Sequence, residues 1–354
     1  MNTNHSRAPA DIAVSARAPA RVLVVDDSMT MRALIRHALG GDPDITVVGE
    51  AANPYEAREM MKALDPDVVT LDVEMPDMNG IEFLEKIMRL RPTPVIMVSN
   101  LTAPGAAATL AALEIGAFDC IAKPGAQSNT FEALPGLVKE AARARAGLAR
   151  RRDGAPRGRT AAALTPSATG PELVGIGSST GGVEALMQVL AEFPADCPPT
   201  LIVQHLPAAF TGSFAARLDR ACPAHVTEAK EGDLVRNGRV YLAPGGGRHM
   251  MLRKGVQPSI ALVEDGPVCG HRPSVDVLFA SIAKNFKGRM TGVILTGMGR
   301  DGAQGLLDMR NCGARTIAQD EDSSLVYGMP RVAYEIGAAE KRVPLARVAR
   351  QIFA

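Results

Sequence analysis

Five polar side chains in the first third of the sequence each follow a short apolar run: Asp26, Asp27, Asp72, Ser99 and Lys123. If these runs are parallel strands, the side chains meet at the carboxyl ends of one sheet, where such sheets bind ligands. Carboxylate oxygens suit Mg²⁺, and a carboxylate beside that cation can attack a phosphoryl donor and form an acyl phosphate. A lysine can pair with the phosphoryl oxygens. Exposed helix caps would explain one such acid, but not a set at successive strand ends.

A second chemical feature lies at residues 177–181, which read GSSTG and match the pattern G-x-S-x-G. Glycines in such a strand-to-helix turn expose the central serine, here Ser179, at a helix N-terminus. A phosphate-binding loop is the alternative, because similar glycine-rich turns cradle phosphates. The segment lacks the lysine of a Walker loop and the spacing of G-x-G-x-x-G, which favours the nucleophile interpretation.

A nucleophilic serine needs a base, and four histidines lie in the same half of the sequence: His205, His225, His249 and His271. His205 directly follows an apolar strand, which places it on the sheet edge of Ser179, whereas His225 is expected at the surface and the other two could be structural. Asp301 follows another strand and can orient the imidazole. The order Ser, His, Asp differs from that of α/β-hydrolases and argues against that superfamily.

The elements that must position these groups alternate between strand and helix. Residues 21–142 show strict alternation, which predicts a doubly wound parallel sheet, and residues 172–354 are again α/β with a β-rich insertion around 226–264. Residues 1–20 have the composition of a disordered tail. Residues 143–171 are rich in Arg, Gly, Pro and Thr without apolar periodicity, which predicts a flexible basic linker.

Composition excludes several classes of protein. The net charge of +1 is the sum of +1 in residues 1–20, −8 in 21–142, +6 in 143–171 and +2 in 172–354, and it leaves no chain-wide footprint for nucleic acid. No apolar run is long enough for a membrane span, and the first residues lack the apolar core of a secretory signal. The five cysteines form no C-x-x-C pair, so free thiols in a reducing cytoplasm are expected.

Residues 21–142 resemble a response-regulator receiver domain. The matching segments are VVDDS (24–28), TLDVEMPDMNG (70–80), MVSN (97–100) and AKP (122–124). The resemblance implies that Asp72 accepts the phosphoryl group, with Asp26 and Asp27 completing the acidic Mg²⁺ pocket. Ser99 takes the place of the switch hydroxyl and Lys123 that of the phosphate-pairing lysine. One departure is Cys120, where many receivers carry an aromatic switch residue.

Residues 172–354 resemble the catalytic domain of the CheB family, the chemotaxis protein-glutamate methylesterases. The matching segments are GIGSSTGG (175–182), QHLP (204–207), YLAPGG (241–246), GHRPSVDVLF (270–279), LTGMGRDG (295–302) and AQDEDSSLVYGMP (318–330). The resemblance implies Ser179 as nucleophile, His205 as base and Asp301 as its orienter. The backbone N–H of Met298 is expected to help bind the oxyanion, and Thr180 to shape the site. The family usually has Asn where this sequence has Arg300.

The combined resemblance implies a phosphorylation-activated hydrolase. It would remove methyl groups from glutamate γ-methyl esters on chemoreceptors and deamidate selected receptor glutamines. The unphosphorylated receiver would restrict the catalytic domain until phosphorylation of Asp72 by a CheA-type histidine kinase relieves the restriction. Mg²⁺ would serve the phosphorylation only, with no cofactor for the ester reaction. We expect a cytoplasmic monomer that neither binds nucleic acid nor inserts into membranes.

Two functions of other classes remain as alternatives. A transcriptional response regulator would carry a DNA-binding second domain, but the second module is too large and too nearly neutral for a helix-turn-helix domain. A non-catalytic, phospho-dependent adaptor of a chemosensory array would have a degenerate hydrolase domain, yet Ser179, His205 and Asp301 are all present. Release of methanol from methylated receptors separates both alternatives from the hydrolase.

Overall fold

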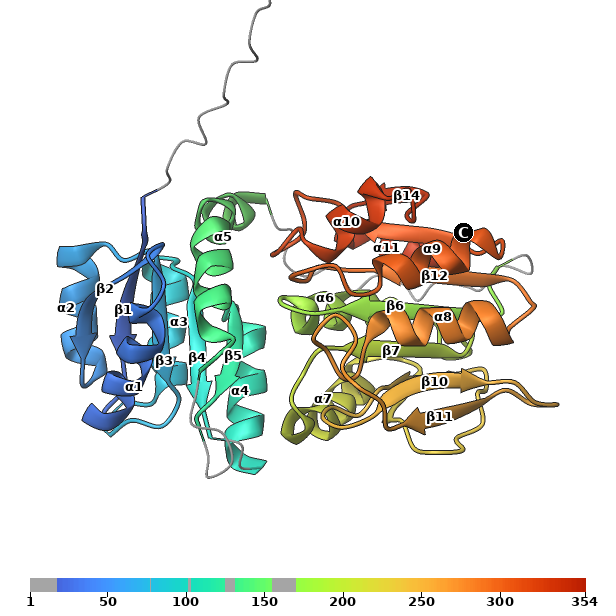
Figure 1. Ribbon diagram of the computed structural model, residues 1–354, viewed down its shortest axis with the longest axis horizontal. Helices are drawn as coiled ribbons and strands as arrows, with labels where there is room; N and C mark the ends of the chain where they lie inside the picture. Colours follow the sequence, from blue (N-terminus) through green and yellow to red (C-terminus); the bar gives the residue numbers. More distant parts are fainter. Residues whose placement is uncertain (1–17, 77, 101–102, 125–130, 155–169) are drawn as a thin grey trace, which may run out of the picture.

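The protein consists of two α/β units that lie side by side, each built around its own parallel sheet (Figure 1). This computed structural model describes residues 18–76, 78–100, 103–124, 131–154 and 170–354. Most of the predicted tail and residues 155–169 of the predicted linker lie outside the described residues. Among the described residues, no helix combines the length and apolar character needed to cross a membrane.

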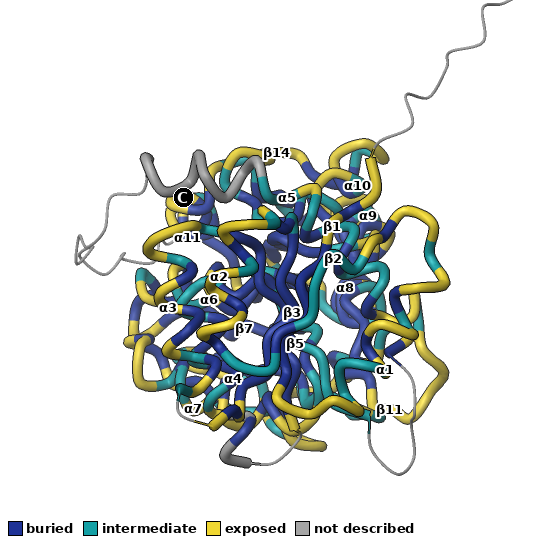
Figure 2. The backbone as a smooth tube through the Cα atoms, turned by 90° about the vertical axis from the view of Figure 1, so that its left-hand side faces the viewer, coloured by how far each residue is buried: buried dark blue, intermediate teal, exposed yellow. Residues whose placement is uncertain are grey.

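The first sheet has five parallel strands in the order β2-β1-β3-β4-β5. The strands are β1 (Ala20–Val25), β2 (Ile45–Ala51), β3 (Val68–Asp72), β4 (Val95–Ser99) and β5 (Asp119–Ala122). Strands β3 and β4 are buried along their whole length, because helices cover both faces of the sheet. The tube in Figure 2 shows these strands as a buried centre surrounded by more exposed helices.

Five helices cover the two faces of this sheet. They are α1 (Met29–Gly40), α2 (Pro54–Leu64), α3 (Gly80–Leu90), α4 (Ala103–Ile115) and α5 (Leu134–Gly154). Alternate residues of β1 divide between the faces: Val22 and Val24 pack with α1 and α5, whereas Leu23 and Val25 pack with α2, α3 and α4. This two-sided covering confirms the predicted doubly wound fold.

The second sheet has seven parallel strands in the order β14-β13-β12-β6-β7-β9-β8. The strands are β6 (Leu173–Ser178), β7 (Thr200–Gln204), β8 (His225–Glu228), β9 (Arg239–Leu242), β12 (Met290–Ile294), β13 (Arg315–Gln319) and β14 (Lys341–Val343). A separate antiparallel hairpin joins β10 (His249–Arg253) to β11 (Ser259–Val263). The region around 226–264 is rich in strands as predicted, but β8 and β9 extend the main sheet, so only the hairpin stands apart.

Six helices cover the second sheet, three on each face. Helices α6 (Gly182–Leu190), α7 (Ala208–Ala221) and α11 (Leu345–Phe353) share one apolar cluster. Helices α8 (Val275–Asn285), α9 (Ala303–Asn311) and α10 (Met329–Glu335) share the other. The second unit is therefore also a doubly wound α/β fold, as expected from the sequence.

Two parts of the chain differ from the sequence prediction. Helix α5 continues to Gly154, so the predicted boundary at 142/143 falls inside a helix. The stretch after residue 142 is rich in Ala and Arg, both good helix formers, and this propensity offsets the missing apolar period. The sequence prediction also does not include α10, β14 and α11. Of these, α11 carried a readable signal, because its buried residues recur at helical spacing: Leu345, Val348, Ala349, Ile352 and Phe353.

Candidate active site

Ser179 lies in the turn between the last residue of β6 and the first turn of α6. It is 8% exposed, and its backbone N–H donates to the carbonyl of Thr296 in the neighbouring strand-end loop at 3.0 Å. Gly181 has a φ of +77°, a left-handed conformation that side chains other than glycine rarely adopt. A Cβ on Gly182 would come within 1.9 Å of Gln204 Oε1, so the turn closes only with glycine there. The two glycines allow the sharp turn that presents Ser179.

His205 follows the last residue of β7, on the same sheet edge as Ser179. Its N–H donates to the carbonyl of Ser178 at 3.1 Å, which ties the two strand ends together. The side chain of Gln204 strengthens this tie. Gln204 Nε2 donates to the carbonyls of Ser179 at 2.8 Å and of His205 at 3.1 Å, and its Oε1 accepts from Ser178 Oγ at 2.7 Å.

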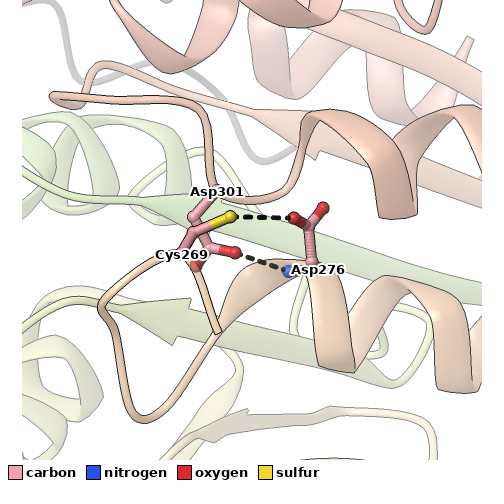
Figure 3. A group of neighbouring side chains, drawn as sticks. All are labelled: Cys269, Asp276 and Asp301. Atoms are coloured by element: carbon pink, nitrogen blue, oxygen red, sulfur yellow. Dashed lines mark hydrogen bonds between the residues drawn. The ribbon is translucent and has the colours of Figure 1, made fainter. Parts of the chain in front are cut away.

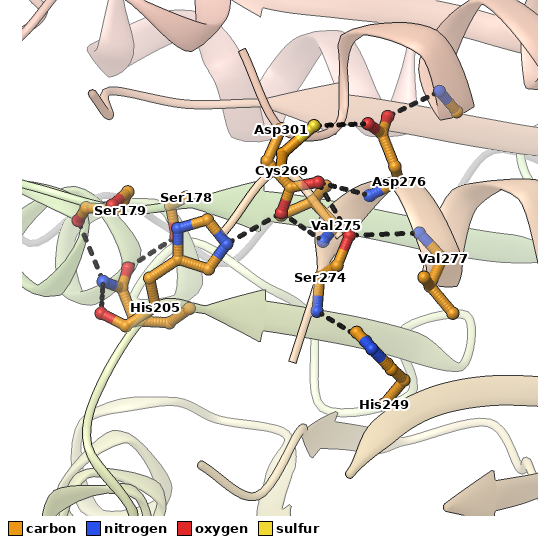
Figure 4. Close-up of polar contacts among 12 residues, drawn as sticks. Ser178, Ser179, His205, His249, Cys269, Ser274, Val275, Asp276, Val277 and Asp301 are labelled. Carbon is orange, nitrogen blue, oxygen red and sulfur yellow. Dashed lines mark hydrogen bonds and ion pairs between the residues drawn. The ribbon is translucent and has the colours of Figure 1, made fainter. Parts of the chain in front are cut away.

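Asp301 is the most firmly held residue of the group. It is 1% exposed, and its Oδ2 lies 2.9 Å from His205 Nε2 (Figure 4). Three more donors come from the start of α8: the N–H of Val275 to Oδ2 at 2.7 Å, Ser274 Oγ to Oδ1 at 2.7 Å, and the N–H of Asp276 to Oδ1 at 3.1 Å. Burial alone would raise the pKa of Asp301, but the hydrogen bonds from His205, Ser274 and Val275 hold it below its usual value. Asp301 is therefore a fixed anion at neutral pH.

The remaining ring nitrogen of His205 decides what this arrangement can do. Asp301 engages Nε2, and Nδ1 is buried without a hydrogen-bond partner among the described residues. An imidazole held by a carboxylate at one nitrogen keeps the other free to accept a proton. The group can therefore supply a serine hydroxyl, a base and an orienting anion. Among the described residues, no hydrogen bond joins Ser179 Oγ to His205 Nδ1.

The other three histidines of this unit differ in their exposure and in their contacts. His225 is exposed and bonded to Asp219 at 2.8 Å, as the surface prediction required. His249 is 1% exposed, with Nε2 at 2.9 Å from the carbonyl of Gly266 and Nδ1 accepting from the N–H of Ser274 at 3.1 Å. His249 therefore helps to position Ser274, whose hydroxyl donates to Asp301. His271 stacks on His205, a contact that sequence analysis did not foresee.

Several residues of the site were thus not predicted from the sequence, although the quoted motifs contain some of them. Gln204 opens the QHLP segment, and His271 and Ser274 lie in GHRPSVDVLF. Met298 and Thr180 were expected near the nucleophile, and both loops are there: a Cβ on Gly297 would lie 2.8 Å from Ser179 Cβ, and the carbonyl of Thr180 accepts from Thr296 Oγ1 at 2.9 Å. Arg300 is exposed, and a hydrogen bond from its side chain to Cys269 lowers the pKa of that thiol against the effect of burial.

A thiol and two carboxylates also meet behind the site. Side-chain atoms of Cys269, Asp276 and Asp301 lie within 4.8 Å of one another (Figure 3). The thiol donates to Asp276 Oδ2 at 3.7 Å, and burial raises the pKa of Cys269. Asp276 Oδ1 accepts from the N–H of Gly305 at 2.7 Å. Because both oxygens of Asp301 already accept hydrogen bonds, we interpret this cluster as structural support and not as a metal centre.

The acids predicted in the first unit gather around one lysine. Asp26 and Asp72 are 0% and 1% exposed, and Lys123 Nζ lies 3.2 Å from Asp26 Oδ2 and 2.8 Å from Asp72 Oδ2. Burial and the neighbouring charge of Asp26 raise the pKa of Asp72, although the bond to Lys123 opposes this. Burial would lower the pKa of Lys123, but the two carboxylates raise it. Its charge therefore balances part of a crowded anionic site.

This group fits a divalent cation. Ligand atoms of Asp26, Asp27 and Asp72 lie within 4.8 Å of one another, and Asp27 is exposed. Among the described residues, the Oδ2 atoms of Asp26 and Asp72 contact only the ammonium group of Lys123, so each retains a lone pair for a metal. Ser99, 1% exposed, ends the adjacent strand and accepts a hydrogen bond from Thr109 Oγ1 at 2.9 Å. All five predicted residues thus lie at one sheet edge.

The first unit covers the edge of the second that holds Ser179. Asp119, at the start of β5, accepts a hydrogen bond from Thr180 Oγ1 at 2.5 Å. Helix α4 packs against α6 and α7, and an ion pair joins Glu114 to Arg217 (Figure 1). Apolar contact adds to this, since the side chain of Met298 packs with the α5 face of the first unit. The contact therefore reaches the residue next to Ser179.

Comparison with known proteins accounts for both units. Residues 22–134 match the response regulator receiver domain, and residues 174–352 match the CheB methylesterase domain. The chain belongs to the CheB methylesterase family. It combines a receiver domain with a methylesterase domain, and the predicted family and enzyme class are confirmed.

Relatives of similar length support the assignment. A protein-glutamate methylesterase/protein-glutamine glutaminase of Agrobacterium fabrum is 57% identical over 339 residues, covering 94% of this chain and 95% of its own. A relative of the same name, numbered 1, from Caulobacter vibrioides is 57% identical over 345 residues, covering 94% and 96%. The crystal structure of the Thermotoga maritima CheB methylesterase catalytic domain is 35% identical, with a TM-score of 0.50, and covers 52% of this chain and 97% of its own.

Proposed function

We propose that this protein hydrolyses glutamate γ-methyl esters and deamidates selected glutamines on chemoreceptors, with Ser179 as nucleophile, His205 as base and Asp301 as its orienter. The observation that carries these roles is the bond between His205 and Asp301, whose carboxylate accepts three further hydrogen bonds beside the turn of Ser179. A carboxylate held this firmly can keep the imidazole of a catalytic base in one tautomer.

In the first step, Ser179 Oγ attacks the γ-carbonyl carbon while His205 Nδ1 takes the hydroxyl proton. The negative charge of Asp301 stabilises the imidazolium through Nε2. Collapse of the tetrahedral adduct breaks the carbon–oxygen bond to methanol, and His205 returns the proton to the departing oxygen. The product of this step is a glutamyl ester of Ser179.

Water completes the reaction by attacking the acyl-enzyme, again with His205 as base, and leaves glutamate and free Ser179. The oxyanion of both steps would be held by backbone N–H groups, including that of Met298, and one such donor contributes about 3–4 kcal/mol in a comparable hydrolase. Glutamine follows the same path with ammonia as leaving group. Methyl offers little to recognise, so docking to the receptor supplies the specificity.

We propose that regulation acts through the contact between the receiver and the sheet edge that holds Ser179. The receiver contacts Thr180 and Met298, the two residues expected to shape the site. Phosphorylation of Asp72 by a CheA-type histidine kinase adds about two negative charges and biases the interdomain contact toward release. Bound Mg²⁺ would be held by Asp26, Asp27 and Asp72, and it would neutralise charge during phosphoryl transfer. Lys123 pairs with the phosphoryl oxygens, and Ser99 supplies the switch hydroxyl.

The remaining features follow from the sequence and stay proposals. We divide the chain into a receiver domain at 21–142, a linker at 143–171 whose first residues continue helix α5 to Gly154, and a catalytic domain at 172–354. The protein would be a cytoplasmic monomer without affinity for nucleic acid and without insertion into membranes. The reducing compartment is supported by the five cysteines, all of which are free thiols. The ester reaction would need no cofactor, because the chain supplies nucleophile, base and orienter.

The decisive experiment measures methanol release from methylated chemoreceptor membranes, with and without a small-molecule phosphodonor. Ser179→Ala should abolish release, since removal of the nucleophile of a serine hydrolase lowers kcat about 10⁶-fold. Ser259→Ala, on the separate β10–β11 hairpin, is the matched control and should behave as wild type. Full activity of the Ser179 variant would show that this serine is not the nucleophile, and an inactive wild-type protein would favour the adaptor alternative.

The same assay tests the receiver. Asp72→Asn should keep basal release but lose the response to the phosphodonor. Chelation of Mg²⁺ should have the same effect, with basal hydrolysis unchanged. A response that survives in Asp72→Asn would exclude this residue as the phosphoryl acceptor, and basal hydrolysis that falls with the chelator would contradict cofactor-free ester chemistry.

A further inference from the structure

His271 ends a tight turn that the proposed mechanism does not use. Val268 and His271 exchange two backbone hydrogen bonds, at 3.1 and 2.9 Å, around Cys269 and Gly270. Both central residues have positive φ, +50° and +81°, as in the two-residue turns that reverse a strand most sharply. For Cys269 this conformation is unfavourable, since side chains other than glycine rarely adopt it. The surrounding structure therefore holds the turn, and with it the position of His271.

The ring of His271 lies flat against the ring of His205. Their centroids are 3.7 Å apart and their planes differ by 9°. The hydrogen bond to Asp301 fixes one ring atom of His205, Nε2, but leaves the imidazole able to turn about the line of that bond. A second ring packed on its face removes this freedom, because a turn of the imidazole would drive it into its neighbour. The stack thus fixes the plane in which Nδ1 lies.

Charge is consistent with this role. Burial, and next the charge of His205, lower the pKa of His271 from 6.5 to about 4, although Asp301 partly opposes the shift. His271 is therefore neutral at neutral pH and does not compete with His205 for the proton of Ser179. When His205 becomes an imidazolium, the neutral ring offers it an aromatic face, which is a favourable contact for a cation.

We propose that His271 is a positioning residue for the hydrolase, which by stacking on His205 holds the imidazole plane so that Nδ1 stays directed at Ser179. The inference rests on the proposed roles of Ser179 and His205. It requires an aromatic face at position 271 but no ring nitrogen. It also requires an effect on kcat more than on KM, because His271 contacts the proposed base.

The test compares four full-length variants in the methanol-release assay: His271→Ala, His271→Gln, His271→Phe and, as control, His225→Ala at the exposed first residue of β8. The first two should lower kcat about 10- to 100-fold, the cost of a misplaced catalytic group, with KM within about twofold of wild type. Phenylalanine keeps the ring face and should restore kcat to within about threefold. His225→Ala should match wild type.

Each outcome decides the proposal. It is overturned if His271→Gln stays within twofold of wild type, or if His271→Phe is as impaired as His271→Gln at an unchanged melting temperature. If His271→Ala does not fold, the Gln and Phe variants carry the comparison. Ser179→Ala is measured beside them: activity in that variant refutes the proposed nucleophile, whereas an inactive Ser179 variant with unaffected His271 variants refutes only the positioning role.

Discussion

Asp72 and Asp301 both lie beyond or at the carboxyl end of a parallel strand, but the two carboxylates have opposite surroundings. Each is an almost fully buried aspartate near the carboxyl end of a parallel strand. Asp301 accepts hydrogen bonds from His205 and three donors at the start of α8, and its pKa is lowered. Asp72 accepts one long backbone bond, from Glu74 at 3.3 Å, and an ion pair from Lys123, and its pKa is raised.

The difference supports the roles proposed for the two carboxylates, a positioning anion at Asp301 and a reactive one at Asp72. An aspartate whose lone pairs are all engaged is fixed and inert, which suits a group that must orient an imidazole through a whole reaction cycle. An aspartate with unengaged lone pairs in a crowded anionic pocket gains from a metal ion and can attack a phosphoryl donor. The hydrogen-bond count around each carboxylate, more than its burial, therefore predicts its role.

Asp301→Asn is the strongest test of this comparison. The amide cannot accept all four hydrogen bonds, and it turns an N–H₂ group toward donors or toward the imidazole. The corresponding change in a serine protease lowers kcat about 10⁴-fold by imposing the wrong tautomer, and we expect a loss of about 10³- to 10⁴-fold in methanol release. Asp308→Asn, on the exposed side of α9, is the control. A variant that retains a tenth of wild-type activity would remove Asp301 from the mechanism.

Sequence and structure agree best where function depends on strand ends. Asp72, Ser179 and His205 could be placed because each directly follows an apolar strand, and parallel strands bring their carboxyl ends to one edge. The missed residues reach the site by other means. His271 arrives on a turn defined by backbone conformation, and Gln204 acts through contacts with backbone carbonyls. Neither geometry leaves a periodic pattern in the sequence.

Contacts between the domains were equally beyond the sequence. Asp119 stands in a strand segment as an ordinary acid, and only the packing of the receiver on the catalytic domain brings it to Thr180. Such a contact depends on the matching of two surfaces that are far apart in the chain. The sequence resemblance implied that the receiver restricts the active site, but it named no residue that does so.

Asp119→Ala should therefore weaken the restriction without any phosphodonor. Burial raises the pKa of Asp119, and the bonds from Thr180 and the N–H of Cys120 oppose the shift. A hydrogen bond to a charged group contributes about 1.5–3 kcal/mol. Because burial of the carboxylate offsets part of this energy, we expect the variant to lose an amount near the lower end of the range. Basal methanol release should then rise about tenfold.

The control for this prediction is Glu85→Ala, an exposed position on α3 away from the catalytic domain. It removes one negative charge from the receiver without touching Thr180. If Asp119→Ala keeps wild-type basal activity while its response to the phosphodonor is normal, the contact with Thr180 has no part in the restriction. Equal activation in both variants would assign the effect to net charge.

The smallest effects should appear in acid stability, where the two aspartates predict opposite signs. Asp301 has a lowered pKa in the folded protein, so its contribution to stability is present above the unfolded value of 3.8 and is lost as pH falls through the folded value. Asp72 has a raised pKa, so the folded protein binds its proton first, and stability falls as pH rises from 3.8 through the folded value. Asp301→Asn should thus flatten the loss of stability in acid, whereas Asp72→Asn should steepen it. Urea unfolding at a series of pH values between 3 and 6, a range that roughly spans the titration of both aspartates, measures how steeply the free energy of unfolding depends on pH in each variant. Slopes that change in the same direction would mean that hydrogen-bond number does not set the charge state of these two carboxylates.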